Sequence, residues 1–156
     1  MQAKQVGKSR WVLVLDRGEE IVETVTDFLE EREIQGGFVT GIGGLRNITL
    51  GYYDLEEKEY LKREFEEVME LGNLAGSVGT VDGRPFLHAH ATVSGPELIA
   101  FSGHLFSAEV AITAELIVAD FGVDLPRETD EEVGLKLFRI EPREEPAHQT
   151  GEESEA

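Results

Sequence analysis

Cysteine is absent from this 156-residue chain, and proline, tryptophan and cationic side chains are few. Without cysteine the chain can form no disulfide bond, no zinc–thiolate site and no cysteine nucleophile. Any metal ion must therefore be bound by His, Asp or Glu. No apolar run approaches the roughly 20 residues that cross a bilayer, and the first ten residues lack the apolar segment of a signal peptide. We therefore expect a cytoplasmic protein without a membrane span.

Positive charge is scarce, because 14 Lys and Arg stand against 32 Asp and Glu and give a net charge of −18. Nucleic acids and anionic lipids are bound through basic patches, so we do not expect a chain of this sign to bind DNA directly. The charge is also explained by solubility, or by adaptation to a salty or hot cell. Part of the acidic excess lies in residues 142–156, a polar, aperiodic segment that we predict to be a disordered tail, with His148 incidental.

Hydrophobic periodicity predicts an α+β fold. Apolar residues from Ile21 to Leu29 recur at helical spacing, which predicts one main amphipathic helix that ends before Gly36-Gly37. Most other segments alternate as strands between turn residues, although "KEYLKREFEEV" is compatible with a strand or a short helix. We predict one domain at residues 10–141 with a central, mostly antiparallel β-sheet, preceded by an N-terminal extension of residues 1–9.

Three of the four histidines lie in "FLHAHATVSGPELIAFSGHLF", residues 86–106. Side chains at i and i+2 of a strand share a face, so His88 and His90 project together. If the chain folds back at the Ser94-Gly95-Pro96 turn, His104 comes onto a neighbouring strand, about 4.8 Å away, and the three imidazoles can reach one ion. Zinc accepts such a set and leaves a fourth position to water or substrate. The same spacing is also compatible with histidines that only hydrogen-bond on a sheet face.

Two glycine motifs have simple structural interpretations. "GIGG" at residues 41–44 is not followed by a helix that could hold a phosphate, so it predicts a bend or bulge. Gly83-Arg84-Pro85 matches the core of an AT-hook, but Asp82 and Phe86 flank it where a hook has basic residues. We interpret it as a turn between strands.

The order of "FEEVMELGNLAGSVG", "FLHAHATVSG" and "FSGHLFSAEVAITAELIV" resembles the PPC domain, the plants-and-prokaryotes-conserved domain that also occurs in plant AT-hook nuclear proteins. The likeness covers roughly Trp11 to Ile140, and its most specific part is the H-x-H followed by G-H-L and a T-x-E strand. The resemblance implies an α/β fold with a central antiparallel sheet, assembly as a homotrimer, and a metal site on His88, His90 and His104. One departure is Ser102, where a second glycine often precedes the G-H-L.

Glu115 is the candidate catalytic residue, on the same strand face as Thr113 in "VAITAELIV". It could orient a metal-bound histidine or act as a base. It could equally pair with Arg46 or another cation at a subunit contact, and the sequence leaves these alternatives open.

These observations support three hypotheses. The first is a trimeric interaction or regulatory module whose three-histidine zinc site is structural or senses a small-molecule or protein ligand. The second is a zinc-dependent enzyme, of hydrolase or lyase type, that uses metal-bound water. The third is DNA association in the family's sense, through a basic partner, because the chain has no AT-hook of its own.

Overall fold

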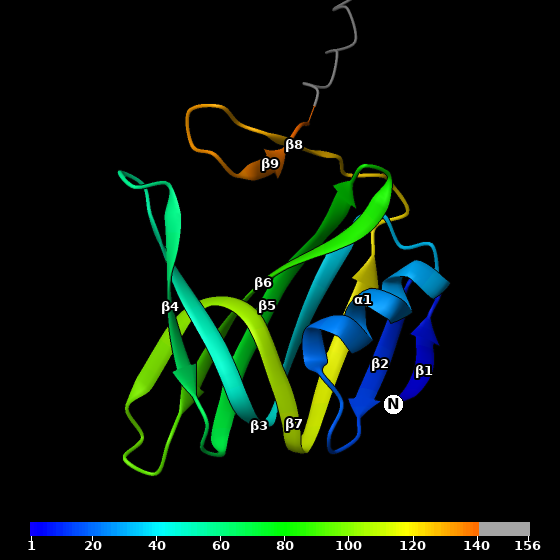
Figure 1. Ribbon diagram of the computed structural model, residues 1–156. Coiled ribbons are helices and arrows are strands. Elements are labelled where there is room, and N and C mark those ends of the chain that lie inside the picture. Colours follow the sequence, from blue (N-terminus) through cyan, green and yellow to red (C-terminus); the bar gives the residue numbers. More distant parts are fainter. Residues whose placement is uncertain (141–156) are drawn as a thin grey trace, which may run out of the picture.

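The computed structural model describes residues 1–140, most of which belong to one β-sheet with a single helix against it (Figure 1). The elements, in chain order, are β1 (Gln2–Gly7), β2 (Arg10–Leu15), α1 (Ile21–Glu31), β3 (Gly37–Asp54), β4 (Glu59–Phe65), β5 (Met69–Val81), β6 (Arg84–Ser94), β7 (Ala100–Asp120), β8 (Arg127–Thr129) and β9 (Lys136–Phe138). Strands β1 to β7 form a sheet of order β1-β2-β7-β6-β5-β3-β4, and β8 and β9 form a separate hairpin.

The sheet closes on itself, because β3 pairs with β7 as well as with β5. The ladders β7–β6, β6–β5, β5–β3 and β3–β7 therefore make a complete circuit. Figure 1 shows β3 and β7 as long, strongly curved ribbons, which lets both take part in several ladders. Closure removes sheet edges that would otherwise expose unpaired backbone groups.

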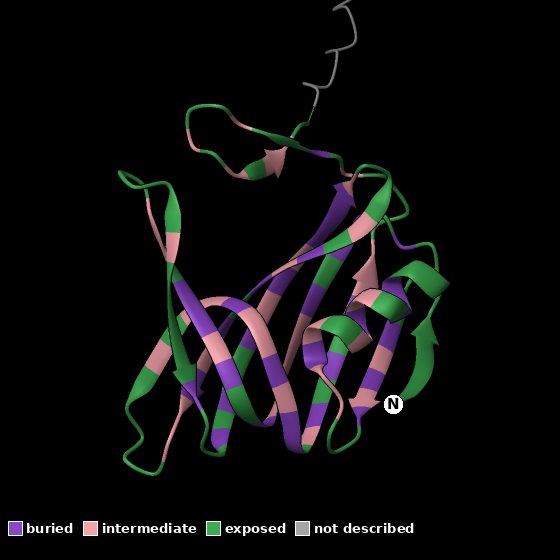
Figure 2. Cartoon of the chain, viewed as in Figure 1, coloured by how far each residue is buried: buried purple, intermediate pink, exposed green. Residues whose placement is uncertain are grey.

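Helix α1 packs on β6 and β7, and its start is fixed by one carboxylate. The Glu20 side chain accepts a hydrogen bond from the backbone N–H of Glu23 at 2.6 Å, as an N-cap does, and another from Ala108 of β7 at 2.8 Å. The apolar face of the helix is buried and consists of Ile21, Val25, Phe28 and Leu29. Figure 2 shows this alternation of buried and exposed positions along the helix and the strands.

The predicted α+β class is confirmed at the coarse level, with strands dominating. All ladders between the named strands are antiparallel, and α1 is the single helix within residues 1–140. The ambiguous segment "KEYLKREFEEV" contains the strand β4. Strand β1 was not expected from the sequence, because its residues are all exposed and have no apolar alternation. The predicted disordered tail, which includes His148, lies outside the described residues, so its prediction stays untested.

Both glycine motifs have the predicted structures. Asp82 and Gly83 connect β5 to β6 with φ angles of +51° and +77°, the left-handed conformations of a tight hairpin turn. The β3–β5 register shifts between Gly41 and Gly43, so the "GIGG" segment forms a β-bulge.

The β8–β9 hairpin is fixed to two distant parts of the sheet. On one side the Arg127 guanidinium donates to Ser77 Oγ at 2.7 Å, and on the other the Tyr53 hydroxyl donates to the Val133 carbonyl at 2.7 Å. In Figure 1 the hairpin spans the space between the β3–β4 end and the β5–β6 end of the sheet. It therefore covers one end of the closed sheet.

Among residues 1–140, no helix has the length and apolar character that crossing a bilayer requires.

We predict that Gly43→Ala lowers the free energy of unfolding by about 1–3 kcal/mol, because a Cβ at this bulge would collide with the Thr113 carbonyl and lie 2.8 Å from Ala114 Cα. Gly72→Ala is the matched control, since its Cβ would meet nothing nearer than Thr92 O at 3.7 Å. We expect the control to change stability by less than about 0.5 kcal/mol in urea unfolding. Equal unfolding midpoints for the two variants would contradict this account of the bulge.

Candidate metal centre

Adjacent strands bring the three predicted histidines together. His88 and His90 alternate on β6, and His104 on β7 is the direct cross-strand partner of His90. Their ring centroids are 5.1 to 5.8 Å apart, and one nitrogen from each ring lies within 4.8 Å of the others. Within residues 1–140 this is the single group of His, Asp or Glu side chains with such convergence.

Aromatic rings hold His104 in place. Its ring centroid is 5.0 Å from that of Tyr60 and 4.7 Å from that of Phe106. Gly51 lies opposite His104 on β3, and a Cβ there would lie 2.5 Å from Phe106 Cε2 and 3.0 Å from Tyr60 Cδ1. The missing side chain of Gly51 therefore provides the space that the two rings occupy beside the histidine.

The histidine chemistry fits a metal ligand set. His104 Nδ1 is buried and has no hydrogen-bond partner among the described residues. A buried imidazole nitrogen without a partner is costly, and a metal ion would satisfy it. Nitrogen ligands of a tetrahedral zinc ion are about 3.3 Å apart, so nitrogens that lie within 4.8 Å of one another would have to approach by at most about 1.5 Å to bind one ion.

His88 and His104 are also in the protonation state that binds metals. Burial, together with the charges of His88, His90 and Lys62, lowers the pKa of His104 to about 4. Burial, followed by the charges of Arg127 and His90, lowers the pKa of His88. Both imidazoles are therefore neutral at physiological pH, and neutral imidazole is the form that coordinates a cation.

A cavity of about 430 Å³ lies beside His88 and His104, beneath the β8–β9 hairpin. Arg127 and Lys136 of the hairpin line it along with apolar side chains of the sheet. Sequence reasoning missed these two cations, because their hairpin has no motif and its place over the histidines depends on contacts with distant residues. The one available signal was the alternation of Leu135, Lys136 and Leu137, which is typical of a short strand.

Glu115 is not part of this cluster. It is exposed, lies eleven positions beyond His104 on β7 (115 − 104), and faces Val14 and Ile42 in the neighbouring ladders. Within residues 1–140 it makes no side-chain hydrogen bond or ion pair, and Arg46 is bound to Glu109 instead, with Nε donating at 3.0 Å. A single chain therefore does not bring Glu115 to the histidines, and its role at a subunit contact stays a prediction.

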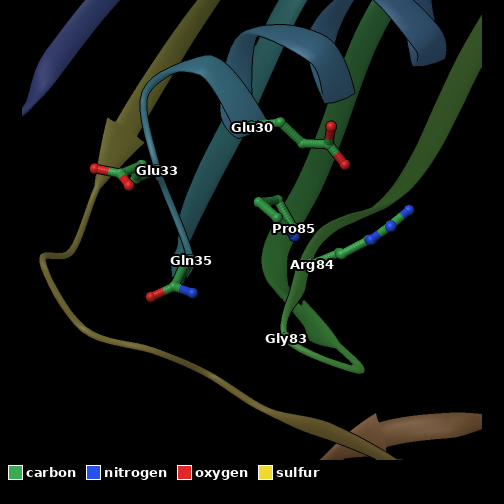
Figure 3. A pocket seen from close by; sticks show the side chains of 6 residues that line it. All are labelled: Glu30, Glu33, Gln35, Gly83, Arg84 and Pro85. Atoms are coloured by element: carbon green, nitrogen blue, oxygen red, sulfur yellow. The ribbon is translucent and has the colours of Figure 1, made fainter.

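A larger hollow, about 740 Å³, lies elsewhere, between the end of α1 and the β5–β6 turn (Figure 3). It is lined by Glu30, Glu33 and Gln35 on one side and by Gly83-Arg84-Pro85 on the other. Figure 3 shows the Arg84 side chain extending away from Glu33 and Gln35. The Gly-Arg-Pro tripeptide thus forms part of a hairpin beside acidic groups, which does not suit insertion into a DNA groove.

Comparisons with known proteins agree on one family. A model of the Plants and Prokaryotes Conserved (PCC) domain matches residues 2–122. Among solved structures, a metal-containing protein of Archaeoglobus fulgidus is 39% identical, with a TM-score of 0.80 and coverage of 87% of this chain and 96% of that one. A plant- and prokaryote-conserved (PPC) protein of Pyrococcus horikoshii is 30% identical, with a TM-score of 0.79 and coverage of 90% and 95%.

A third structure, from Bacteroides thetaiotaomicron, is provisionally described as a DNA-binding protein. It is 29% identical, with a TM-score of 0.85 and coverage of 88% of this chain and 96% of that one. No curated protein matches the chain.

Proposed function

Because the chain belongs to the Plants and Prokaryotes Conserved domain family, abbreviated PCC or PPC, we propose that it is a trimeric interaction or regulatory module that binds one zinc ion at His88, His90 and His104. The observation that carries the proposal is the convergence of three imidazole nitrogens within 4.8 Å, one of them in a ring whose Nδ1 is buried without a partner. The metal-containing relative from Archaeoglobus fulgidus supports it further. Three imidazole ligands without a thiolate suit zinc, although copper, nickel or iron accept the same ligands.

The surroundings of the histidines favour ligand sensing over hydrolysis. A bound zinc ion would supply a Lewis-acidic position for an oxygen ligand, since three protein ligands leave its fourth position open. A hydrolase also needs a general base within hydrogen-bond reach of the reacting water. Among the described residues that line the adjacent cavity there is no carboxylate, and burial raises the pKa of the Tyr60 hydroxyl there. We therefore place the zinc-dependent enzyme second.

We predict that the protein, purified without a histidine tag, contains about one zinc ion per chain. The variant His88→Ala/His90→Ala/His104→Ala should contain none by elemental mass spectrometry. His104→Ala alone should weaken zinc binding by at least about 100-fold, because loss of an outer-shell partner already costs about 10–100-fold.

His148→Ala is the matched control, because it removes a histidine from the tail and should leave the zinc content unchanged. Equal zinc content in the wild type and in a folded triple variant would contradict the metal site. Far-UV circular dichroism distinguishes that result from a loss of structure.

The trimer proposal rests on the outward face of the β3–β7 ladder. Apolar side chains that a monomer would leave in water lie on this face or beside it: Phe38, Ile42, Ile112 and Ile117 are 42%, 57%, 56% and 49% exposed. Exposed apolar surface on a sheet is usually covered by association, and symmetric self-association is its commonest form. The resemblance to the PPC domain supplies the number of subunits, and Glu115 would lie on the same surface.

We predict a homotrimer of about 52 kDa in light scattering, three times the 17.3 kDa of one chain. Ile42→Lys and Ile117→Lys each place a charge on the proposed interface and should yield monomers. Leu98→Lys, at an apolar residue that is 80% exposed on the β6–β7 loop, is the control and should remain trimeric. A wild-type monomer at micromolar concentration would end the proposal.

We also propose that the chain alone has no useful affinity for duplex DNA, although a related structure is provisionally described as DNA-binding. The net charge of −18 opposes the phosphate backbone, and the tripeptide that resembles a hook is part of a turn. Fluorescence anisotropy with a labelled duplex in about 150 mM salt should show no saturation at micromolar protein. A sub-micromolar complex under these conditions would mean that a local basic surface outweighs the net charge.

A further inference from the structure

The cavity beneath the β8–β9 hairpin differs in charge from the rest of the molecule. The chain has 32 Asp and Glu residues, yet none of them is among the described residues that line this cavity. Its ionisable lining consists of Arg127, Lys136, His88, His104 and Tyr60. A negatively charged protein thus contains a cavity whose fixed charges are positive.

Arg127 is the least satisfied of these groups. It is only 8% exposed, its Nη1 and Nη2 donate to the neutral Lys136 carbonyl and Ser77 hydroxyl, and its Nε is buried without a partner. No carboxylate within residues 1–140 forms an ion pair with it. A buried charge is normally paired, so this guanidinium lacks the anion that its environment calls for.

The guanidinium is also held in one place. Its Cζ lies 3.8 Å from the ring centroid of Phe138 and 5.7 Å from that of Phe86. The Lys62 ammonium, whose charge acts on His104, lies 3.9 Å from the ring centroid of Phe106. Aromatic contacts therefore position two cations near the histidine cluster.

The apolar walls of the cavity determine what kind of ligand can fill it. They are formed by apolar side chains from two strands and the hairpin: Phe86, Leu87, Leu105, Phe106, Leu135 and Leu137. A volume of about 430 Å³ falls within the range of small-molecule sites. Inorganic phosphate or sulfate would leave these walls without a contact, whereas an organic acid with an apolar body would use both walls and charges.

We propose that this cavity binds a small organic monocarboxylate, with its carboxylate group toward Arg127, Lys136 and the metal position at His88 and His104, and its apolar body against the leucine and phenylalanine walls. The inference rests on the proposed zinc site in one respect, because the ion supplies part of the positive charge. It identifies the chemical class of ligand that a sensing module of this kind would detect.

The proposal is tested by isothermal titration of the zinc-loaded protein with phenylacetate and with 2-phenylethanol, which has the same apolar body and no charge. Phenylacetate should bind at least about tenfold more tightly, because a charge-assisted hydrogen bond is roughly twice as strong as a neutral one and zinc adds to it. Equal affinity for the two compounds, in protein that contains one zinc ion per chain, would overturn the carboxylate assignment and leave the metal site standing.

Variants assign the effect to the cavity. Lys136→Gln should weaken phenylacetate binding and leave 2-phenylethanol binding unaffected. The hairpin should stay intact in this variant, because the Lys136 side chain is exposed and its backbone carbonyl, which accepts a hydrogen bond from Arg127, is retained. Lys4→Gln makes the same charge change on the edge strand β1 and should alter neither ligand. Arg127→Met should have the larger effect, with circular dichroism and thermal unfolding to detect loosening of the hairpin. If Lys4→Gln and Lys136→Gln weaken binding equally, net charge rather than this cavity binds the anion.

The two proposals fail separately. A protein that takes up no zinc but still binds phenylacetate through Arg127 and Lys136 would refute the metal site and support the anion cavity. Titration of the metal-free triple histidine variant provides this comparison directly.

Discussion

Strand β7 hydrogen-bonds to three neighbours, and the positions of the other strands in the main sheet follow from those ladders. It pairs with β2 and β6 and, along much of its length, with β3. In the β6 ladder His104 lies opposite His90, and in the β3 ladder it lies opposite Gly51. Because side chains alternate between faces, a slip of one residue in either ladder would turn His104 away from its partners. The histidine cluster is thus a consequence of strand register.

Charge has opposite roles at two scales in this protein. Over the whole molecule the net charge of −18 draws divalent cations toward the surface and repels anions. At the covered cavity, the buried Arg127 reverses that sign over a few ångströms, where burial weakens screening by solvent, and the exposed Lys136 at its lining adds to the positive charge. A metal ion and an organic anion can therefore be attracted to neighbouring positions, the first by the long-range field and the second by the local one.

Local patterns in the sequence predict much of this structure. The i and i+2 spacing of His88 and His90, the turn at Asp82-Gly83 and the bulge in "GIGG" each depend on residues a few positions apart, and all three occur as predicted. The placement of His104 needed one further assumption, the reversal of the chain after β6, which is also a local event.

The parts that sequence reasoning missed depend on distant contacts. β1 is exposed along its whole length, so no apolar alternation marks it as a strand. The sequence around Arg127 predicts an exposed cation, because the contact that helps to bury it is with Ser77, fifty positions earlier. Glu115 also depends on distant contacts: within one chain, register places it opposite Val14 and Ile42 and away from the histidines, and its role at a subunit contact stays a prediction.

The separation along the chain between the histidines and their cover has a consequence for folding. His88 and His104 are 16 residues apart (104 − 88) and meet when the β6–β7 hairpin forms, whereas the contact between Tyr53 and Val133 that fixes the β8–β9 hairpin spans 80 residues. Closing the longer loop costs about 1.4 kcal/mol more in chain entropy. Chain connectivity therefore favours formation of the histidine cluster before its cover.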